Sequence, residues 1–171
     1  MAVQLIRPDL KFEKSYRGYI AELQNEERYP FPLDWEFETF SEIVQRCEEL
    51  SEGKNIPEGF VPSTTFWLVE GDELVGVSNL RQCLNERIRL EGGHIGLGIR
   101  PSRRGNGYGA MLLGLTIKKA HEYGISEIHI HCHKENEASV RMIRSTGSVL
   151  DSEITTITSG QVIQRYVHAA T

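Results

Sequence analysis

The stretch Gly92–Leu113, GGHIGLGIRPSRRGNGYGAMLL, decides the fold. Its apolar part, His94–Ile99, predicts a strand, and Gly96 and Gly98 leave one face of this strand bare, so that another group can approach closely. A proline ends the strand. Two arginines and three alternating glycines follow, and the apolar periodicity of the next segment, Met111–Tyr123, predicts a helix.

This order of strand, glycines and helix is typical of a phosphate-binding loop. The first N–H groups of a helix have no partner within the helix and carry partial positive charge, so an anion can bind there. Glycines let the backbone approach that anion without a Cβ in the way. Arg103 and Arg104 add charge-assisted donors, although Arg103 could equally be a solvated surface charge.

Three known loops of this kind can be told apart. The Gly-x-x-x-x-Gly-Lys-Ser/Thr loop is excluded, because no Lys-Ser or Lys-Thr follows the glycines. Gly105, Gly107 and Ala110 fit the loose dinucleotide pattern Gly-x-Gly-x-x-Ala, but five residues separate the strand from the first glycine. That pattern also requires an acidic residue at the end of the next strand, where this chain has Cys132-His133-Lys134.

The third loop fits. Arg104–Gly109, RGNGYG, matches Arg/Gln-x-x-Gly-x-Gly/Ala, the pyrophosphate loop of the GNAT N-acetyltransferase superfamily, and Arg100-Pro101 is the usual lead-in. A second motif of that superfamily follows at the right separation and is carried by Asn136, Ala138, Ser139, Ile143 and Gly147. The chain therefore resembles this superfamily over Gly92–Leu150. Its GGHIGxGIRPS run and terminal IQRY also resemble a little-characterised bacterial branch.

The resemblance implies one α/β (α+β) acetyltransferase domain over residues 1–171, with a mixed, mostly antiparallel sheet and about four flanking helices. At the centre, His94–Ile99 and Ser126–Cys132 would form a splayed pair of parallel strands joined by the helix Met111–Tyr123. Other predicted strands are Val3–Arg7, Thr64–Glu70, Leu74–Arg81, Val149–Thr156 and Gln161–His168. Helices are predicted from Asp9, over Phe37–Leu50 and between Asn136 and Gly147.

Acetyl-CoA is the cofactor that the resemblance implies. Its pyrophosphate would lie on Arg104–Ala110, and its pantetheine arm would pair with free backbone groups of Leu97 and Ile99. Asn136 would reach the arm across the gap or cap its own helix, and one side chain can serve both roles. The residues expected to bind the cofactor are Leu97, Gly98, Ile99, Arg103, Arg104, Gly105, Asn106, Gly107, Tyr108, Gly109, Ala110, Asn136 and Ser139.

The implied chemistry is direct attack of a neutral amine on the thioester, which needs a base because an amine is protonated at neutral pH. Glu91 and His94 are the candidate bases, although Glu91 could instead be simply solvated and His94 a surface or core-edge histidine bonded to the backbone. The Leu97 N–H would polarise the carbonyl. Ile143 stands where the superfamily commonly has a tyrosine acid, so Tyr166 or Ser139 would replace it, or the thiolate would leave unassisted.

The acceptor is expected to be a small-molecule or peptide amine. In the superfamily its pocket lies between the first two helices and the last two strands, which here places Glu26, Glu27, Arg28 and Tyr29 opposite Thr155–Gly160. Two carboxylates there would suit a cationic amine. His129, His131 and His133 share one strand face but do not by themselves predict a metal. The alternative function is a CoA-binding regulatory module without turnover, which Ile143 makes credible.

Composition sets further bounds. The net charge of −5 disfavours generic nucleic-acid binding, and no apolar run predicts a membrane span or a signal peptide. Three scattered cysteines argue against structural zinc and favour a cytoplasmic protein. A homodimer is an expectation by analogy only, because dimers are frequent in the superfamily.

Overall fold

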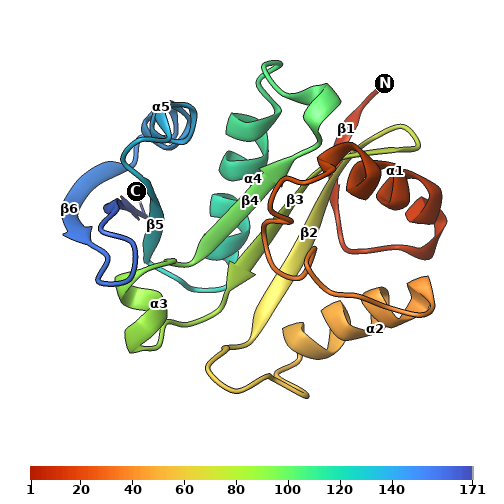
Figure 1. The fold of residues 1–171 in the computed structure, drawn as a ribbon, viewed down its shortest axis with the longest axis horizontal. Helices are drawn as coiled ribbons and strands as arrows, with labels where there is room; N and C mark the ends of the chain where they lie inside the picture. Colours follow the sequence, from red (N-terminus) through yellow and green to blue (C-terminus); the bar gives the residue numbers. More distant parts are fainter. Residues whose placement is uncertain (171) are drawn as a thin grey trace.

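Two antiparallel sheets form the centre of the computed structural model, which describes residues 1–170 (Figure 1). The strand order of the first sheet is β1 (Val3–Ile6), β2 (Ser63–Glu70), β3 (Glu73–Arg81) and β4 (Ile95–Ile99). The order of the second is β5 (Glu127–His133), β7 (Val162–Ala169) and β6 (Val149–Thr155). Residue 171 of the expected 1–171 domain lies outside the described residues.

The helices are α1 (Glu13–Leu23), α2 (Phe40–Ser51), α3 (Glu86–Leu90), α4 (Tyr108–Glu122) and α5 (Glu137–Ser145). The sequence missed α3, a short helix that begins where the Asn85 side chain accepts a hydrogen bond from the Ile88 N–H. Asp9 caps a turn of 3₁₀ helix that leads into α1. No helix within residues 1–170 has the length and apolar character needed to cross a membrane.

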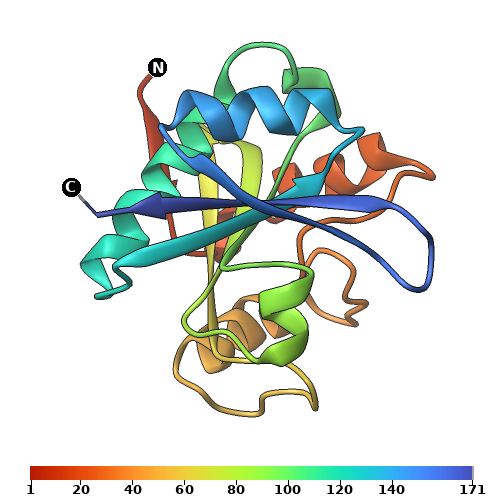
Figure 2. The same ribbon diagram turned by 90° about the vertical axis from the view of Figure 1, so that its left-hand side faces the viewer.

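Helices cover both faces of the first sheet. Trp67 and Val69 of β2 pack with α1 and α2, whereas Phe66 and Leu68 point to the opposite face and pack with side chains of α4. This double cover explains why β2 is buried at every residue but the last and why its apolar residues, Phe66–Val69, are consecutive instead of alternating with polar ones. Figure 2 shows the second sheet in front, with α5 above it and α3 below.

The two sheets meet at one point, where β4 and β5 begin. Gly93 and Ile130 form an isolated bridge, and the His94 N–H donates to the His129 carbonyl at 2.7 Å. From there β4 and β5 run in the same general direction and diverge (Figure 1). The mixed fold with a splayed central pair is as predicted. Every ladder within residues 1–170 is antiparallel, however, so β4 and β5 share direction and no parallel ladder.

The bare face of β4 is filled by Tyr29, from the loop between α1 and α2. A Cβ on Gly96 would collide with the Tyr29 hydroxyl, and a Cβ on Gly98 would collide with the Tyr29 carbonyl. Both glycines are therefore required by a close approach of the protein's own chain. This contact brings the α1–α2 loop, which carries Glu26 and Glu27, directly over β4.

Candidate active site

The edge of β4 that faces β5 has unpaired backbone groups. The Arg100 N–H donates to the Val75 carbonyl at 2.8 Å, which fixes the register between β3 and β4. Backbone groups of alternate residues in a strand point to opposite edges, so residues 94, 96, 98 and 100 pair with β3. The N–H and C=O groups of Leu97 and Ile99 therefore point into the gap, as predicted from the resemblance.

The Ile99 carbonyl is nevertheless not free, and the expectation for this atom is wrong. Nε of Arg104 donates to it at 3.0 Å, while Nη2 of Arg104 donates to Glu26 at 2.8 Å. The guanidinium of Arg104 thus joins the outer end of β4 to the α1–α2 loop. Within residues 1–170, only the Ile99 N–H and both groups of Leu97 remain unpaired along this stretch of the edge.

The loop before α4 has the geometry of an anion site. Gly105 and Gly107 adopt φ angles of 77° and 82°, and a Cβ at either position would meet no atom within 4 Å. No side chain caps α4, whose N-cap residue is Gly107. Within the described chain, the backbone N–H groups of residues 105–110 donate no hydrogen bond. These six donors at a helix N-terminus are available to a phosphate.

Other side chains of this loop are engaged elsewhere. Arg103 forms ion pairs with Glu70, at 3.3 Å, and with Glu73, and the Tyr108 hydroxyl donates to Glu70 at 3.0 Å. Both side chains therefore turn toward the β2–β3 hairpin, and only the backbone of Tyr108 lines the loop. The Asn106 amide donates to the carbonyls of residues 103 and 104 and stabilises the turn.

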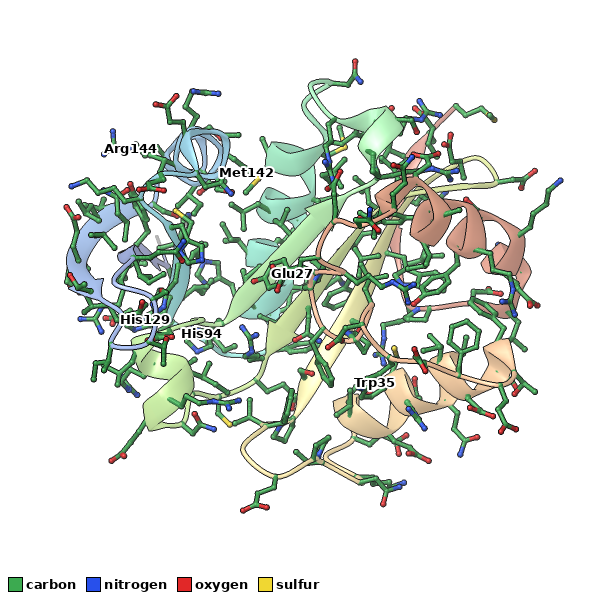
Figure 3. The ribbon with its side chains drawn as sticks, in the orientation of Figure 1. Glu27, Trp35, His94, His129, Met142 and Arg144 are labelled. Atoms are coloured by element: carbon green, nitrogen blue, oxygen red, sulfur yellow. The ribbon has the colours of Figure 1, made fainter. Side chains whose placement is uncertain are left out.

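Gly109 and Ala110 belong to the first turn of α4. A Cβ on Gly109 would lie 2.9 Å from Sδ of Met142, so this glycine permits close packing of α4 against α5. Figure 3 labels Met142 on α5, facing α4. The glycine of the motif at this position thus serves helix packing, in addition to any contact with a ligand.

A cleft of about 660 Å³ lies between β5 and the α1–α2 loop. Glu26, Glu27 and Tyr29 line one side, and Thr156, Thr158 and Ser159 of the β6–β7 loop line another. These are the two segments that the sequence predicted to face each other. Glu27 lies over β4 near the middle of the molecule (Figure 3).

Glu91, Asn136 and Ser139 also line this cleft. The Asn136 side-chain oxygen accepts a hydrogen bond from the Ser139 N–H at 3.1 Å and so caps α5. Its side-chain nitrogen donates to no group within residues 1–170, which leaves that nitrogen for a ligand. Both roles considered for Asn136 are therefore compatible.

His94 is not brought to the cleft. It is buried where the two sheets meet, beside His129 (Figure 3), and its Nδ1 accepts a hydrogen bond from the His129 N–H at 2.9 Å. Burial, assisted by His129, Arg89 and Arg81, lowers the pKa of His94 to about 4. Its contacts are those of a residue that joins the sheets.

Tyr166 is also away from the cleft. It is completely buried in the core, and its hydroxyl donates to Gln164 at 2.8 Å. Ile143 is buried in the same cluster. Neither side chain reaches a substrate, so the missing tyrosine acid has no replacement at these two positions.

The sequence analysis missed Arg81, which looks like an ordinary strand residue. It considered His131 only as one of three histidines on a strand face. It placed Tyr29 in the acceptor pocket, but only the glycines of the strand signalled that Tyr29 packs on β4. The Nδ1 of His131 accepts from the Gly92 N–H at 3.1 Å, and burial lowers the pKa of His131 to about 3. No three metal-ligating side chains converge among residues 1–170.

The unpaired edge of β4 leads to an uncapped, glycine-rich helix start, and this arrangement suits an extended ligand that bears phosphate. A family model described as acetyltransferase (GNAT) family matches residues 20–147, and the chain belongs to this family. A search of the curated proteins finds no match to the chain.

Solved structures with the same fold include several acetyltransferases. RimL, a ribosomal L7/L12 α-N-protein acetyltransferase in complex with coenzyme A, has a TM-score of 0.71 at 15% identity, covering 99% of this chain and 94% of RimL. The structure of yncA from Salmonella typhimurium, with its cofactor acetyl-CoA, has a TM-score of 0.64 at 13% identity, covering 99% of this chain and 94% of yncA. A chimera of the spermidine N-acetyltransferase SpeG from Vibrio cholerae has a TM-score of 0.64 at 18% identity, covering 99% of this chain and 96% of the chimera. At these identities the likeness shows the fold alone.

The buried His94 predicts a pH-dependent stability. An unfolded histidine takes up a proton near pH 6.5, whereas folded His94 does so only near pH 4. Between these values the unfolded chain binds more protons, so the free energy of unfolding falls as the pH falls from 6.5 toward 4. We expect His94 to contribute a loss of roughly 1 kcal/mol per pH unit there. Urea unfolding at pH 7 and pH 5.5 measures this loss.

The substitution His94→Asn keeps a hydrogen-bond acceptor near the position of Nδ1 but cannot titrate. With His94→Asn the free energy of unfolding should depend less steeply on pH. His133→Asn, at an exposed histidine of β5, should leave that dependence unchanged. If the free energy of unfolding changed equally with pH in the wild type and in His94→Asn, the burial of His94 would be contradicted.

Proposed function

We propose that this chain is an N-acetyltransferase that transfers the acetyl group of acetyl-CoA to a primary amine by direct attack in a ternary complex. The observation that carries the proposal is the continuity of unpaired donors along one path. The free backbone groups of Leu97 on β4 are followed by the uncapped N-terminus of α4. Arg104 joins this end of β4 to Glu26, which lines the cleft.

In this proposal the cofactor supplies the acetyl thioester, and the chain binds it mainly through its backbone. The N–H groups of residues 105–110 would hold the pyrophosphate. The pantetheine arm would continue along β4 by pairing with Leu97, and the free side-chain nitrogen of Asn136 would contact it from α5. Family membership and the acetyl-CoA and CoA complexes of yncA and RimL support this cofactor.

The reaction removes two protons from a protonated amine and exchanges one bond. The base takes the first proton, and the neutral amine then forms the new N–C bond at the thioester carbon. As the C–S bond breaks, the thiolate of CoA leaves, and the nitrogen releases its second proton to that thiolate or to water. A thiol pKa of about 8.5 makes this thiolate an adequate leaving group even without an acid at Ile143. The Leu97 N–H would donate to the carbonyl oxygen. Of the two candidate bases, we propose Glu91, because it lines the cleft and His94 does not.

We propose that residues 1–171 form one acetyltransferase domain, because the solved relatives match 99% of this chain. The three free cysteines fit a cytoplasmic location. RimL and SpeG are named for protein and spermidine acceptors, which supports an amine acceptor in general without selecting one.

The second candidate is a CoA-binding regulatory module without turnover. The buried aliphatic Ile143 at the position of the usual acid favours it. Release of the free thiol of CoA in the presence of a panel of amines separates the two. Stimulated release establishes transfer, whereas CoA binding with no amine-stimulated release supports the module.

The pyrophosphate loop can be tested with a matched pair of glycines. Gly107 and Gly124 have φ angles of 82° and 84° and open space around them, so Glu causes similar backbone strain at both. Gly107→Glu places a carboxylate among the free N–H groups and should weaken acetyl-CoA binding at least about 100-fold, because two negative groups then compete for one site. Gly124→Glu, at the end of α4, should bind normally. Calorimetry measures the Kd of each variant for acetyl-CoA. Equal Kd values for Gly107→Glu and Gly124→Glu would refute the assignment of residues 105–110 as the pyrophosphate loop.

The base assignment predicts a kinetic effect confined to turnover. Glu91→Gln should lower kcat about 100-fold or more, the usual contribution of a general base. The KM for acetyl-CoA should stay near that of the wild type, because Glu91 lies away from the loop before α4. Glu86→Gln, in the nearby helix α3, is the control and should keep full turnover. A Glu91→Gln enzyme with unchanged kcat would show that another group removes the proton.

A further inference from the structure

Arg81 is a cation of the cleft without a carboxylate partner. It lies at the end of β3, and its Nη1 donates to the Gly93 carbonyl at 2.9 Å. No Asp or Glu oxygen of the described chain lies within 4 Å of its guanidinium, whereas Arg100, Arg103 and Arg104 all have such partners. The hydrogen bond to Gly93 fixes the plane of the group.

Arg81 lines the cleft and has donors to spare. Its Nε and Nη2 donate no hydrogen bond within residues 1–170, and because they are not among the buried unpaired side-chain atoms they keep contact with solvent. Arg81 is half-buried, and a half-buried guanidinium keeps its charge while losing part of its hydration. A fixed, poorly hydrated fork of N–H donors is the arrangement that binds a carboxylate with two parallel hydrogen bonds.

The phosphates of CoA are too far away to be this anion. In the β3–β4 register Gly76 pairs with Ile99, next to the pyrophosphate loop, and Arg81 lies five residues further along β3. At about 3.3 Å per residue the two ends are roughly 16 Å apart. The charge of Arg81 therefore serves whatever enters the cleft from the side of the acceptor.

Carboxylates share the cleft with Arg81. Charges of both signs act on the Tyr29 hydroxyl: withdrawal from water raises the pKa of Tyr29, Arg81 lowers it and Glu27 raises it. Glu27 and Glu91 have no ion-pair partner within residues 1–170. The cleft thus holds one arginine and two carboxylates that have no ion-pair partner within residues 1–170, and this mixture of charges is a poor match for a polycationic acceptor.

We propose that the acceptor is a zwitterionic amine of the amino-acid class, whose carboxylate binds Arg81 while its ammonium group lies toward the cleft carboxylates. This inference rests on the proposed acetyl transfer and narrows its substrate. Arg81 is then the residue that selects amines bearing a carboxylate over plain amines of the same side chain.

Matched acceptors test the proposal. The proteinogenic amino acids are each compared with the amine that their decarboxylation gives, by release of the free thiol of CoA. For the best acceptor we expect kcat/KM to favour the amino acid over its amine about 10- to 100-fold, the range for hydrogen bonds to a charged group, with most of the difference in KM. Arg81→Gln should bring this ratio close to one.

Two further variants separate charge recognition from a structural role. Arg81→Gln and Arg81→Lys both lose the guanidinium bond to Gly93, but Arg81→Lys keeps the charge and should keep part of the preference. Arg87→Gln removes a neighbouring cation that packs on Phe60 outside the cleft, and should keep all of it.

The outcomes are distinct. A preference for an amino acid that Arg81→Gln abolishes supports the inference. Transfer to plain amines without preference, or a preference that survives Arg81→Gln, overturns the inference and leaves the proposed acetyl transfer intact. Absence of transfer to every acceptor overturns both.

Discussion

The backbone of β4 can satisfy only one of its two edges within the protein, and the candidate site follows from this constraint. Strands β4 and β5 touch at Gly93 and His94 and then separate, so Leu97 has no strand beside it. Unpaired backbone groups away from water are costly, and an extended ligand that supplies the missing hydrogen bonds removes that cost. In the proposed function, the cofactor rather than another strand completes this edge of the sheet.

Charge in the molecule is divided between pairs that stabilise the fold and groups left for ligands. Arg103 and Arg104 carry the strongest phosphate signal in the sequence, yet each is held by carboxylates, Arg103 by Glu70 and Glu73 and Arg104 by Glu26. The unpaired donors before α4 are therefore mainly backbone N–H groups. Arg81, which the sequence does not distinguish from other strand residues, lines the cleft and has no carboxylate partner within residues 1–170.

Local patterns predicted the fold well, because strand, glycine loop and helix of residues 92–113 depend on neighbours in sequence. The two loops facing the cleft also followed from the family resemblance. Side-chain assignments were less predictable, since they depend on distant contacts. His94 looked like a base but is used where the sheets meet, Tyr166 is used in the core, and Tyr29 is placed over β4 by the glycines opposite it. No sequence pattern specifies which of several histidines or tyrosines is buried.

The most direct test of an open β4 edge is hydrogen exchange of individual backbone amides, measured by NMR with and without CoA. The N–H groups of Leu97, Ile99 and residues 105–110 should exchange at least about 10-fold more slowly in the complex, because a hydrogen-bonded amide exchanges only when it opens. Amides already paired with β3, such as that of Gly98, should change little. Slowed exchange on another surface, with Leu97 and residues 105–110 unaffected, would contradict the account.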